Sequence, residues 1–221
     1  MRLVWYGHSC FLYDFGASKV LVDPFLEGNT YAPVKPKDIE EVDIVLVTHD
    51  HSDHLGDAIE ILKRTGASST GVFELMNMFQ ERGVKNVIPA NVGGRIRIGD
   101  VTVSIVPAIH TCSVGTPVGY VISHGEDTIY HAGDTSYTSD MAIIGRLYKV
   151  KAACLPIGGH YTMGVEEAIE AVKDIKPRYV IPMHYNTFDV IRVDVKVFEE
   201  GVRRETEAEP LILQPGKWVE I

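Results

Sequence analysis

A seven-residue segment, Thr48-His49-Asp50-His51-Ser52-Asp53-His54, concentrates side chains that bind transition metals. His49 and His51 are two residues apart, so an extended backbone places both imidazoles on one side, where they can hold one ion. Asp53 and His54 follow where the chain turns towards an expected helix. Adjacent side chains diverge at a turn, so Asp53 and His54 can bind a second ion beside the first. The spacing therefore predicts a metal centre with room for two ions.

One segment cannot complete the coordination of two ions, so further ligands must come from elsewhere in the chain. Three candidates, His110, Asp134 and His184, each follow an apolar, β-branched run that is typical of a strand. Functional groups of open α/β folds gather outside the carboxyl ends of strands. We therefore expect these three side chains to meet the segment 48–54.

The elements that must position these residues are short strands and a few helices. Strands are expected at Leu3–Tyr6, Phe11–Phe15, Val20–Val22, Ile44–Val47, Val101–Val106, Val118–Ile122, Thr128–His131, Ala152–Pro156, Tyr179–Met183 and Leu211–Leu213. Helices are expected at Ala58–Arg64, Phe73–Glu81, Asp140–Leu147 and Val165–Ile175. This order predicts one α/β (α+β) domain over residues 1–221, with two mixed sheets and helices outside them. The irregular segment Pro24–Lys37 is interpreted either as a binding loop or as a variable surface loop.

Composition narrows the function classes. The 221 residues carry a net charge of −9, and no run of Lys and Arg offsets it. This argues against a long nucleic acid as partner, whereas a small anionic substrate stays compatible because a metal supplies positive charge locally. No signal peptide or membrane segment is apparent, and three scattered cysteines suit a reducing cytoplasm. The oligomeric state stays open, with a homo-oligomer among the options.

The pattern resembles the metallo-β-lactamase superfamily. The matching pieces are the segment 48–54, then His110, Gly133-Asp134-Thr135 and His184, in the order of that family. The segments Tyr6-Gly-His-Ser-Cys10 and Leu155-Pro-Ile-Gly-Gly159 look like one branch, the small metal-dependent hydrolases related to L-ascorbate-6-phosphate lactonase. N-acyl-phosphatidylethanolamine phospholipase D looks like a more distant relative. The resemblance implies an αββα four-layer sandwich with the active site at one edge.

The resemblance also implies how the ligands are shared. His49, His51 and His110 would hold the first metal, whereas Asp53, His54 and His184 would hold the second. Asp134 would bridge them. Five imidazoles and two carboxylates suit Zn²⁺ best, with Mn²⁺, Fe²⁺ or Ni²⁺ as alternatives.

Such a centre predicts hydrolysis of a small ester, lactone or phosphodiester. Two ions about 3.5–4 Å apart lower the pKa of a shared water to near 7, which yields a nucleophile at neutral pH. The alternative from another class is an oxidoreductase with one iron, of the persulfide dioxygenase type. A third, a metal-stabilised module without activity, is disfavoured because structural sites rarely need a bridged pair. The presence of His51, where flavodiiron proteins place Glu, also disfavours an oxygen-reducing iron site.

For each of four polar residues near the expected ligands, the sequence is compatible with two roles. His8, between two strands, is either a hydrogen-bonded structural histidine or an acid/base or substrate contact. His160 is either a loop residue or a substrate-binding residue. Asp50 and Asp23 are either solvated turn residues or partners that orient ligand imidazoles. The remaining histidines, His124 and His131, and Cys112 are expected to be ordinary structural residues.

Overall fold

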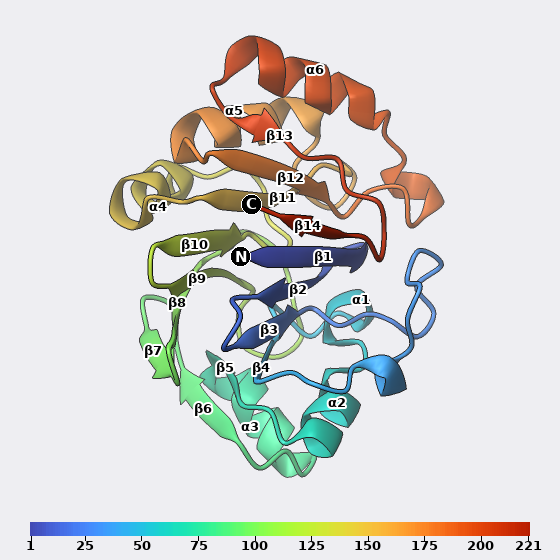
Figure 1. Ribbon diagram of the computed structural model, residues 1–221, viewed down its shortest axis with the longest axis vertical. Helices are drawn as coiled ribbons and strands as arrows, with labels where there is room; N and C mark the ends of the chain where they lie inside the picture. The colour runs from blue at the N-terminus through green and yellow to red at the C-terminus, as the bar shows by residue number, and fades with distance from the viewer.

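The computed structural model covers residues 1–221 and shows an αββα sandwich with two β-sheets as its middle layers (Figure 1). A continuous core of 60 buried apolar residues joins the layers. The strand Ile44–Leu46 (β4) is buried on both faces, as its unbroken apolar sequence predicts. None of the helices combines the length and the apolar character that crossing a bilayer requires.

The first sheet has the strand order β14-β1-β2-β3-β4. Strands β1, β2 and β3 pair antiparallel, and β4 joins parallel to β3. Besides β4, the members are β1 (Arg2–Gly7), β2 (Cys10–Asp14), β3 (Lys19–Val22) and β14 (Trp218–Glu220).

The second sheet has seven strands in the order β13-β12-β11-β10-β9-β8-β7. Strands β8, β9 and β10 pair antiparallel, and β11 joins parallel to β10, so the pairing order of β1–β4 occurs a second time. The members are β7 (Arg95–Ile98), β8 (Val101–Pro107), β9 (Val118–His124), β10 (Asp127–His131), β11 (Ala152–Pro156), β12 (Tyr179–Met183) and β13 (Glu209–Pro210). A separate pair consists of β5 (Ser69–Val72) and β6 (Val87–Ala90).

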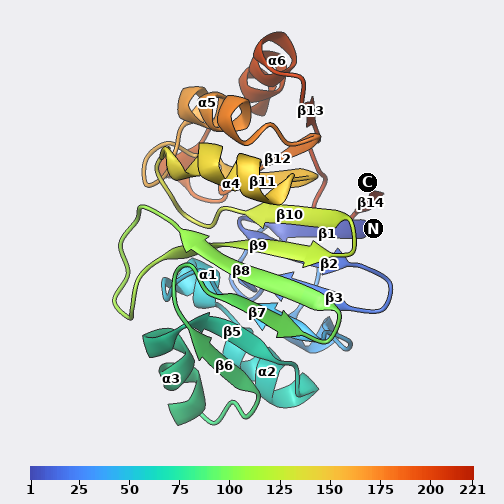
Figure 2. The same cartoon turned by 90° about the vertical axis from the view of Figure 1, so that its left-hand side faces the viewer.

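Most of the longer helices lie towards the two ends of the long axis, whereas the short α1 lies near its middle (Figure 1). At one end are α4 (Asp140–Tyr148), α5 (Val165–Ile175) and α6 (Val195–Glu205), and Figure 2 shows α4 and α5 stacked beside β11 and β12. At the other end are α2 (Ala58–Thr65) and α3 (Phe73–Glu81). The short helices are α1 (Ser52–Leu55) and the 3₁₀ turns η1 (Pro36–Asp38) and η2 (Asp189–Ile191).

The sequence predictions hold for nine of the ten expected strands and all four expected helices. The exception is Leu211–Leu213, which has no strand: only Leu211 continues the ladder of β13, donating from its backbone nitrogen to the Val180 carbonyl at 2.9 Å. Helix α6 was not predicted, since its start, Val195-Lys196-Val197, alternates like a strand and Gly201 interrupts its interior. The segment Pro24–Lys37 is irregular up to η1.

Candidate metal centre

The segment 48–54 turns sharply after β4. Bends at Thr48, Asp50 and His51 lead to the N-cap of α1, which is His51, and the helix then carries Asp53 and His54. The side chains therefore leave the backbone in two directions. His49 and His54 are buried, whereas His51 and Asp53 are partly exposed.

A first cluster combines His49 and His51 with His110, which lies in the connection between β8 and β9. One nitrogen from each ring lies within 4.8 Å of the others. The Nε2 atom of His49 lies 2.9 Å from Nδ1 of His51, and the His110 ring centroid is 5.1–5.2 Å from the other two. Three imidazoles that converge in this way form one face of a tetrahedral zinc site.

A second cluster combines His8, Asp53, His54 and His184, again with ligand atoms within 4.8 Å. His8 occupies the turn between β1 and β2, and His184 directly follows β12. The Nε2 atom of His8 lies 3.0 Å from Asp53 Oδ2, and the ring centroids of His8 and His184 are 4.0 Å apart. Three of these residues are the ligands that the resemblance implies for one ion, and the structure adds His8 to the group.

Asp134 lies between the two clusters. One carboxylate oxygen is 3.3 Å from His54 Nε2, and the other is 3.0 Å from His184 Nε2 and 3.6 Å from His110 Nε2. The preceding Gly133 has φ +63°, and a Cβ atom there would lie 2.9 Å from Thr48 Cβ. Only glycine lets the loop after β10 come this close to the segment after β4.

Several polar atoms of these clusters are buried without a hydrogen-bond partner. They are Nε2 of His54, Nε2 of His110, Nδ1 of His184 and Oδ1 of Asp134. Leaving a buried polar atom unpaired costs about 1–3 kcal/mol, so four in one place demand an explanation. Metal ions account for three of them, on His54, His110 and Asp134, because unprotonated imidazole nitrogens and carboxylate oxygens are the donors that Zn²⁺ and similar ions bind. His184 faces Asp134 with its other nitrogen, Nε2, at 3.0 Å. The residues present therefore fit a metal centre.

The electrostatics of the clusters also suit cations. Burial lowers the pKa of His49 to about 3 and that of His8 to about 4, so both rings are neutral at pH 7. Burial also opposes a charge on His54, but the carboxylates of Asp134 and Asp23 outweigh it and raise the pKa of that ring well above its usual value. In the metal-free protein a proton on His54 thus supplies the positive charge that these carboxylates require.

A buried hydrogen-bond network around Asp23 holds the His54 ring on the side that faces away from Asp134. Asp23, which follows β3, accepts hydrogen bonds from the backbone nitrogen and hydroxyl of Thr48, both at 2.8 Å. Its Oδ2 atom lies 2.8 Å from His54 Nδ1 and 3.4 Å from His131 Nε2. The Tyr13 hydroxyl lies 3.0 Å from the other nitrogen of His131. Asp23 therefore orients the His54 ring so that Nε2 points towards Asp134.

The remaining candidate residues lie outside the two clusters and make other contacts. Asp50 contacts no ligand ring and instead accepts from the Ser113 backbone nitrogen at 2.8 Å, so it joins two loops. His160 is exposed, and its ring packs only against Tyr161, with centroids 4.5 Å apart. Cys112, expected in the core, is partly exposed and donates to the Val114 carbonyl. His124, as expected, is an ordinary residue, paired with the surface carboxylate of Asp100.

Two contributors escaped the sequence analysis. His131 was expected to be an ordinary strand histidine, but it is fully buried against Asp23. Thr187 was not considered, yet its hydroxyl lies 3.1 Å from His8 Nδ1. The only sequence signal for His131 was its place three residues before Asp134, and nothing in the sequence marks Thr187.

Comparisons with known proteins match this chain to a family and to solved structures of the same fold. The model of the β-lactamase superfamily domain matches residues 18–185. A UPF0173 metal-dependent hydrolase of Methanopyrus kandleri is 45% identical over 227 residues, with 98% of each chain covered, and one of Staphylothermus marinus is 46% identical over 225 residues, again with 98% of each covered. The solved structure of Igni18, a metallo hydrolase of Ignicoccus hospitalis, superposes with a TM-score of 0.94 at 36% identity, covering 99% of this chain and 97% of the other.

Proposed function

This chain belongs to the β-lactamase superfamily, and from that premise we propose that it is a metal-dependent hydrolase that works with two divalent ions. Its relatives share the name metal-dependent hydrolase, and the two histidine clusters supply the donors that this activity needs.

The proposed ligands divide as the two clusters do. His49, His51 and His110 hold one ion, and Asp53, His54 and His184 hold the other, with the carboxylate of Asp134 between them. The observation that carries this proposal is the group of buried, unpartnered ligand atoms on three of these residues, His54, His110 and Asp134. The absence of a thiolate among the donors favours Zn²⁺, with Mn²⁺, Fe²⁺ or Ni²⁺ as alternatives.

Bound ions would supply two things, namely a water of lowered pKa and a positive field that stabilises a developing oxyanion. The protein's own contribution is to hold the ligand set in place. Two divalent cations exceed the negative charge of Asp53 and Asp134, so the centre attracts an anionic or strongly polarised substrate even though the chain as a whole is acidic.

His8 is best explained as a positioning residue. Its side chain is fully buried, and its two ring nitrogens lie 3.0 Å from Asp53 Oδ2 and 3.1 Å from Thr187 Oγ1. With both nitrogens engaged, His8 has none left for the acid/base role considered from the sequence. We propose that neutral His8 donates to Asp53 from Nε2 and accepts from Thr187 at Nδ1, which fixes the carboxylate towards the second ion.

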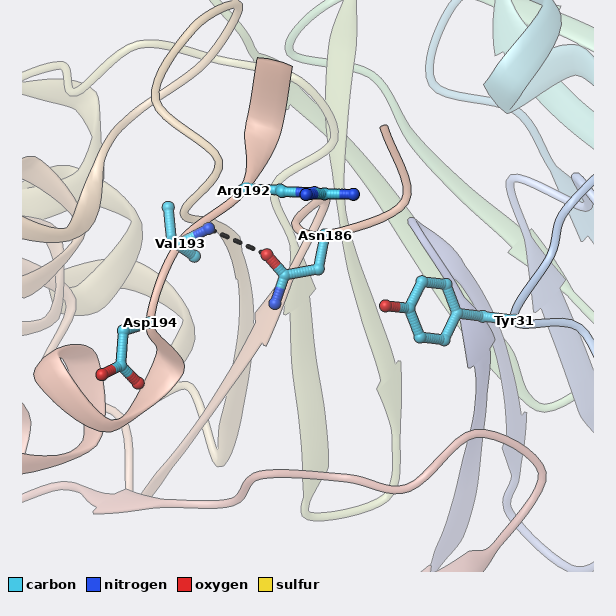
Figure 3. A pocket seen from close by; sticks show the side chains of 5 residues that line it. All are labelled: Tyr31, Asn186, Arg192, Val193 and Asp194. Atoms are coloured by element: carbon cyan, nitrogen blue, oxygen red, sulfur yellow. Dashed lines mark hydrogen bonds between the residues drawn. The ribbon is translucent and has the colours of Figure 1, made fainter. Parts of the chain in front are cut away.

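The proposed substrate is a small ester, lactone or phosphodiester. A hollow of about 550 Å³ lies between the loop after β3 and the loop after β12, and its lining includes Tyr31, Asn186 and Arg192 (Figure 3). This size suits a small molecule. The loop after β12 also carries Thr187 and Phe188, which both contact His8, so an occupant of the hollow would lie beside the residues that hold Asp53. We propose that the part of the substrate that does not react binds here.

Metal analysis combined with a hydrolysis screen tests the proposal. Purified protein loaded with Zn²⁺, Mn²⁺ or Fe²⁺ should retain two ions per chain and hydrolyse at least one phosphodiester, lactone or thioester probe. The His51→Ala variant should lose one ion and the activity. His124→Ala is the matched control, because it removes a histidine that pairs with Asp100 and stacks on Phe15, away from the clusters. A single iron with oxygen uptake would favour the oxidoreductase alternative, and failure to retain any transition metal would exclude both.

A further inference from the structure

A second cavity lies at the edge of the second sheet opposite the metal centre. Its volume is about 1280 Å³, and it lies where α4 and α5 end and β11 and β12 begin. The metal ligands follow the carboxyl ends of the strands, so the length of a strand separates the two sites. For the five residues of β12 this is about 16 Å.

Six of the chain's 21 basic residues line this cavity, with only three acidic ones, although the chain as a whole is acidic. We call it the basic cavity and define it by these six: Arg146, Lys149, Lys151, Lys173, Lys176 and Arg178. Sequence inspection finds no run of Lys and Arg because the six residues come from two helices and two strand starts. The fold gathers them in one place.

Most of this charge is uncompensated. Lys173 pairs with Glu205 at 2.8 Å and Lys151 with Asp127 at 2.6 Å. The other four basic side chains form no ion pair in the structure. Among the acids, Glu205 is engaged by Lys173 and Arg204, the Asp174 carboxylate accepts from the Tyr137 hydroxyl, and Glu207 forms no ion pair. With six basic and three acidic side chains, the lining keeps an excess of three positive charges, which an anion would balance.

The cations form two matching rows. Lys149-Val150-Lys151 leads into β11, and Lys176-Pro177-Arg178 leads into β12. The two strands pair in parallel, with Ala152 opposite Tyr179, and the Tyr179 nitrogen donates to the Lys151 carbonyl at 2.9 Å. The two rows therefore lie side by side.

Two of the lysines also adopt a backbone that disfavours them. Lys149 and Lys176 follow α4 and α5 directly, with φ values of +47° and +54°. Glycine is the usual residue at such a left-handed helix end, because it has no Cβ atom to clash. Compensation of helix dipoles accounts for a cation at these two positions, but not for Arg178, which lies beyond the helix. The guanidinium of Arg178 is held 4.9 Å from the Tyr179 ring centroid.

From this arrangement we propose that the basic cavity binds a small molecule that carries two or more phosphate groups. The paired rows offer three cations without an ion pair, Lys149, Lys176 and Arg178, from two directions, which matches a diphosphate better than a single charge. Apolar side chains, among them Ile143, Val172 and Ile175, line the same cavity and can pack against an organic portion. The site is independent of the metal centre and of the proposed hydrolysis.

Calorimetric titration of the metal-loaded protein with pyrophosphate and with adenosine diphosphate tests the site. The key variant is Lys149→Gly with Lys176→Gly, which removes two cations and also relieves the left-handed backbone. We expect binding of at least one probe to weaken about tenfold or more and to fall further with added salt. The thermal unfolding midpoint should stay equal or rise, so loss of binding cannot be attributed to loss of fold.

The control is Lys85→Gln with Lys217→Gln, which removes two exposed lysines outside the cavity. A probe that binds only at the metal centre would lose no affinity in the glycine variant, and that result would overturn the proposal. Tighter binding of adenosine diphosphate than of pyrophosphate would support an organic ligand, and equal binding would support phosphate groups alone. Binding of neither probe would also overturn it.

Discussion

The two halves of the sandwich repeat one order of strand pairings but use it for different chemistry. His8 lies between β1 and β2, as His110 lies between β8 and β9, and Asp23 follows β3 as Asp134 follows β10. In the second half the aspartate lies between the two histidine clusters, whereas in the first half it supports a ligand ring from behind.

The contrast is sharpest after the fourth strand of each half. After β4 the chain places His49 and His54 in the centre, within one short turn. After β11 the corresponding loop carries Gly158, Gly159 and the exposed His160. A shared scaffold therefore fixes where side chains meet, but the loop residues decide which half supplies ligands and which supplies support.

The largest expected effect is that of Asp134→Asn, which should be more severe than the matching change at Asp23. Asp134→Asn should remove one ion per chain and lower kcat/KM by about a thousandfold or more, because a shared ligand holds both clusters together. Metal content and steady-state kinetics of the same preparation would check this. Retention of two ions and near-normal turnover would show that Asp134 is not shared.

The matching change in the first half, Asp23→Asn, should be milder. Loss of a group that orients a ligand weakens metal affinity by about 10–100-fold, and turnover should recover when excess metal is added. Competition with a chelator measures the affinity. If excess metal failed to restore activity, Asp23 and Asp134 would not differ in the way proposed.

Acid should lower the stability of the metal-free protein mainly by protonating His8 in the first half. The folded-state pKa of His8 is about 4, below the unfolded value of 6.5, so between these values the unfolded chain binds more protons and stability falls as pH falls. From pH 6.5 to 5 this amounts to about 2 kcal/mol for one such histidine. Thermal unfolding of metal-free protein should show this slope, and His8→Gln should reduce it more than His110→Gln does. Equal slopes in both variants would contradict the assignment.

The smallest expected effect concerns the loop after β11. An exposed side chain without a specific partner contributes within about 0.5 kcal/mol, so His160→Ala should change kcat/KM by less than about threefold. Steady-state kinetics on the substrate found by the screen would measure this. A KM raised tenfold or more with kcat unchanged would instead make His160 a substrate contact.

Much of the candidate centre was predictable because metal ligands combine rare residue types with strict spacing. The segment 48–54 and the positions after the strands identified seven residues, and six of them lie in the two histidine clusters with Asp134 between them. The roles of Asp23 and Thr187 were less accessible, since they depend on contacts between residues 31 and 179 positions apart. Helix α6 was missed for a local reason, namely that its first residues alternate like a strand.

The spread of the candidate ligands along the chain bears on how the protein acquires its metal during synthesis. A nascent chain exposes His49 and His51 long before His184 leaves the ribosome, and the intervening strands must pair before the second cluster exists. An ion captured early meets an incomplete ligand set and exchanges readily. An ion in the second cluster would therefore be selected only after β12 has docked, from whatever the surrounding pool then offers.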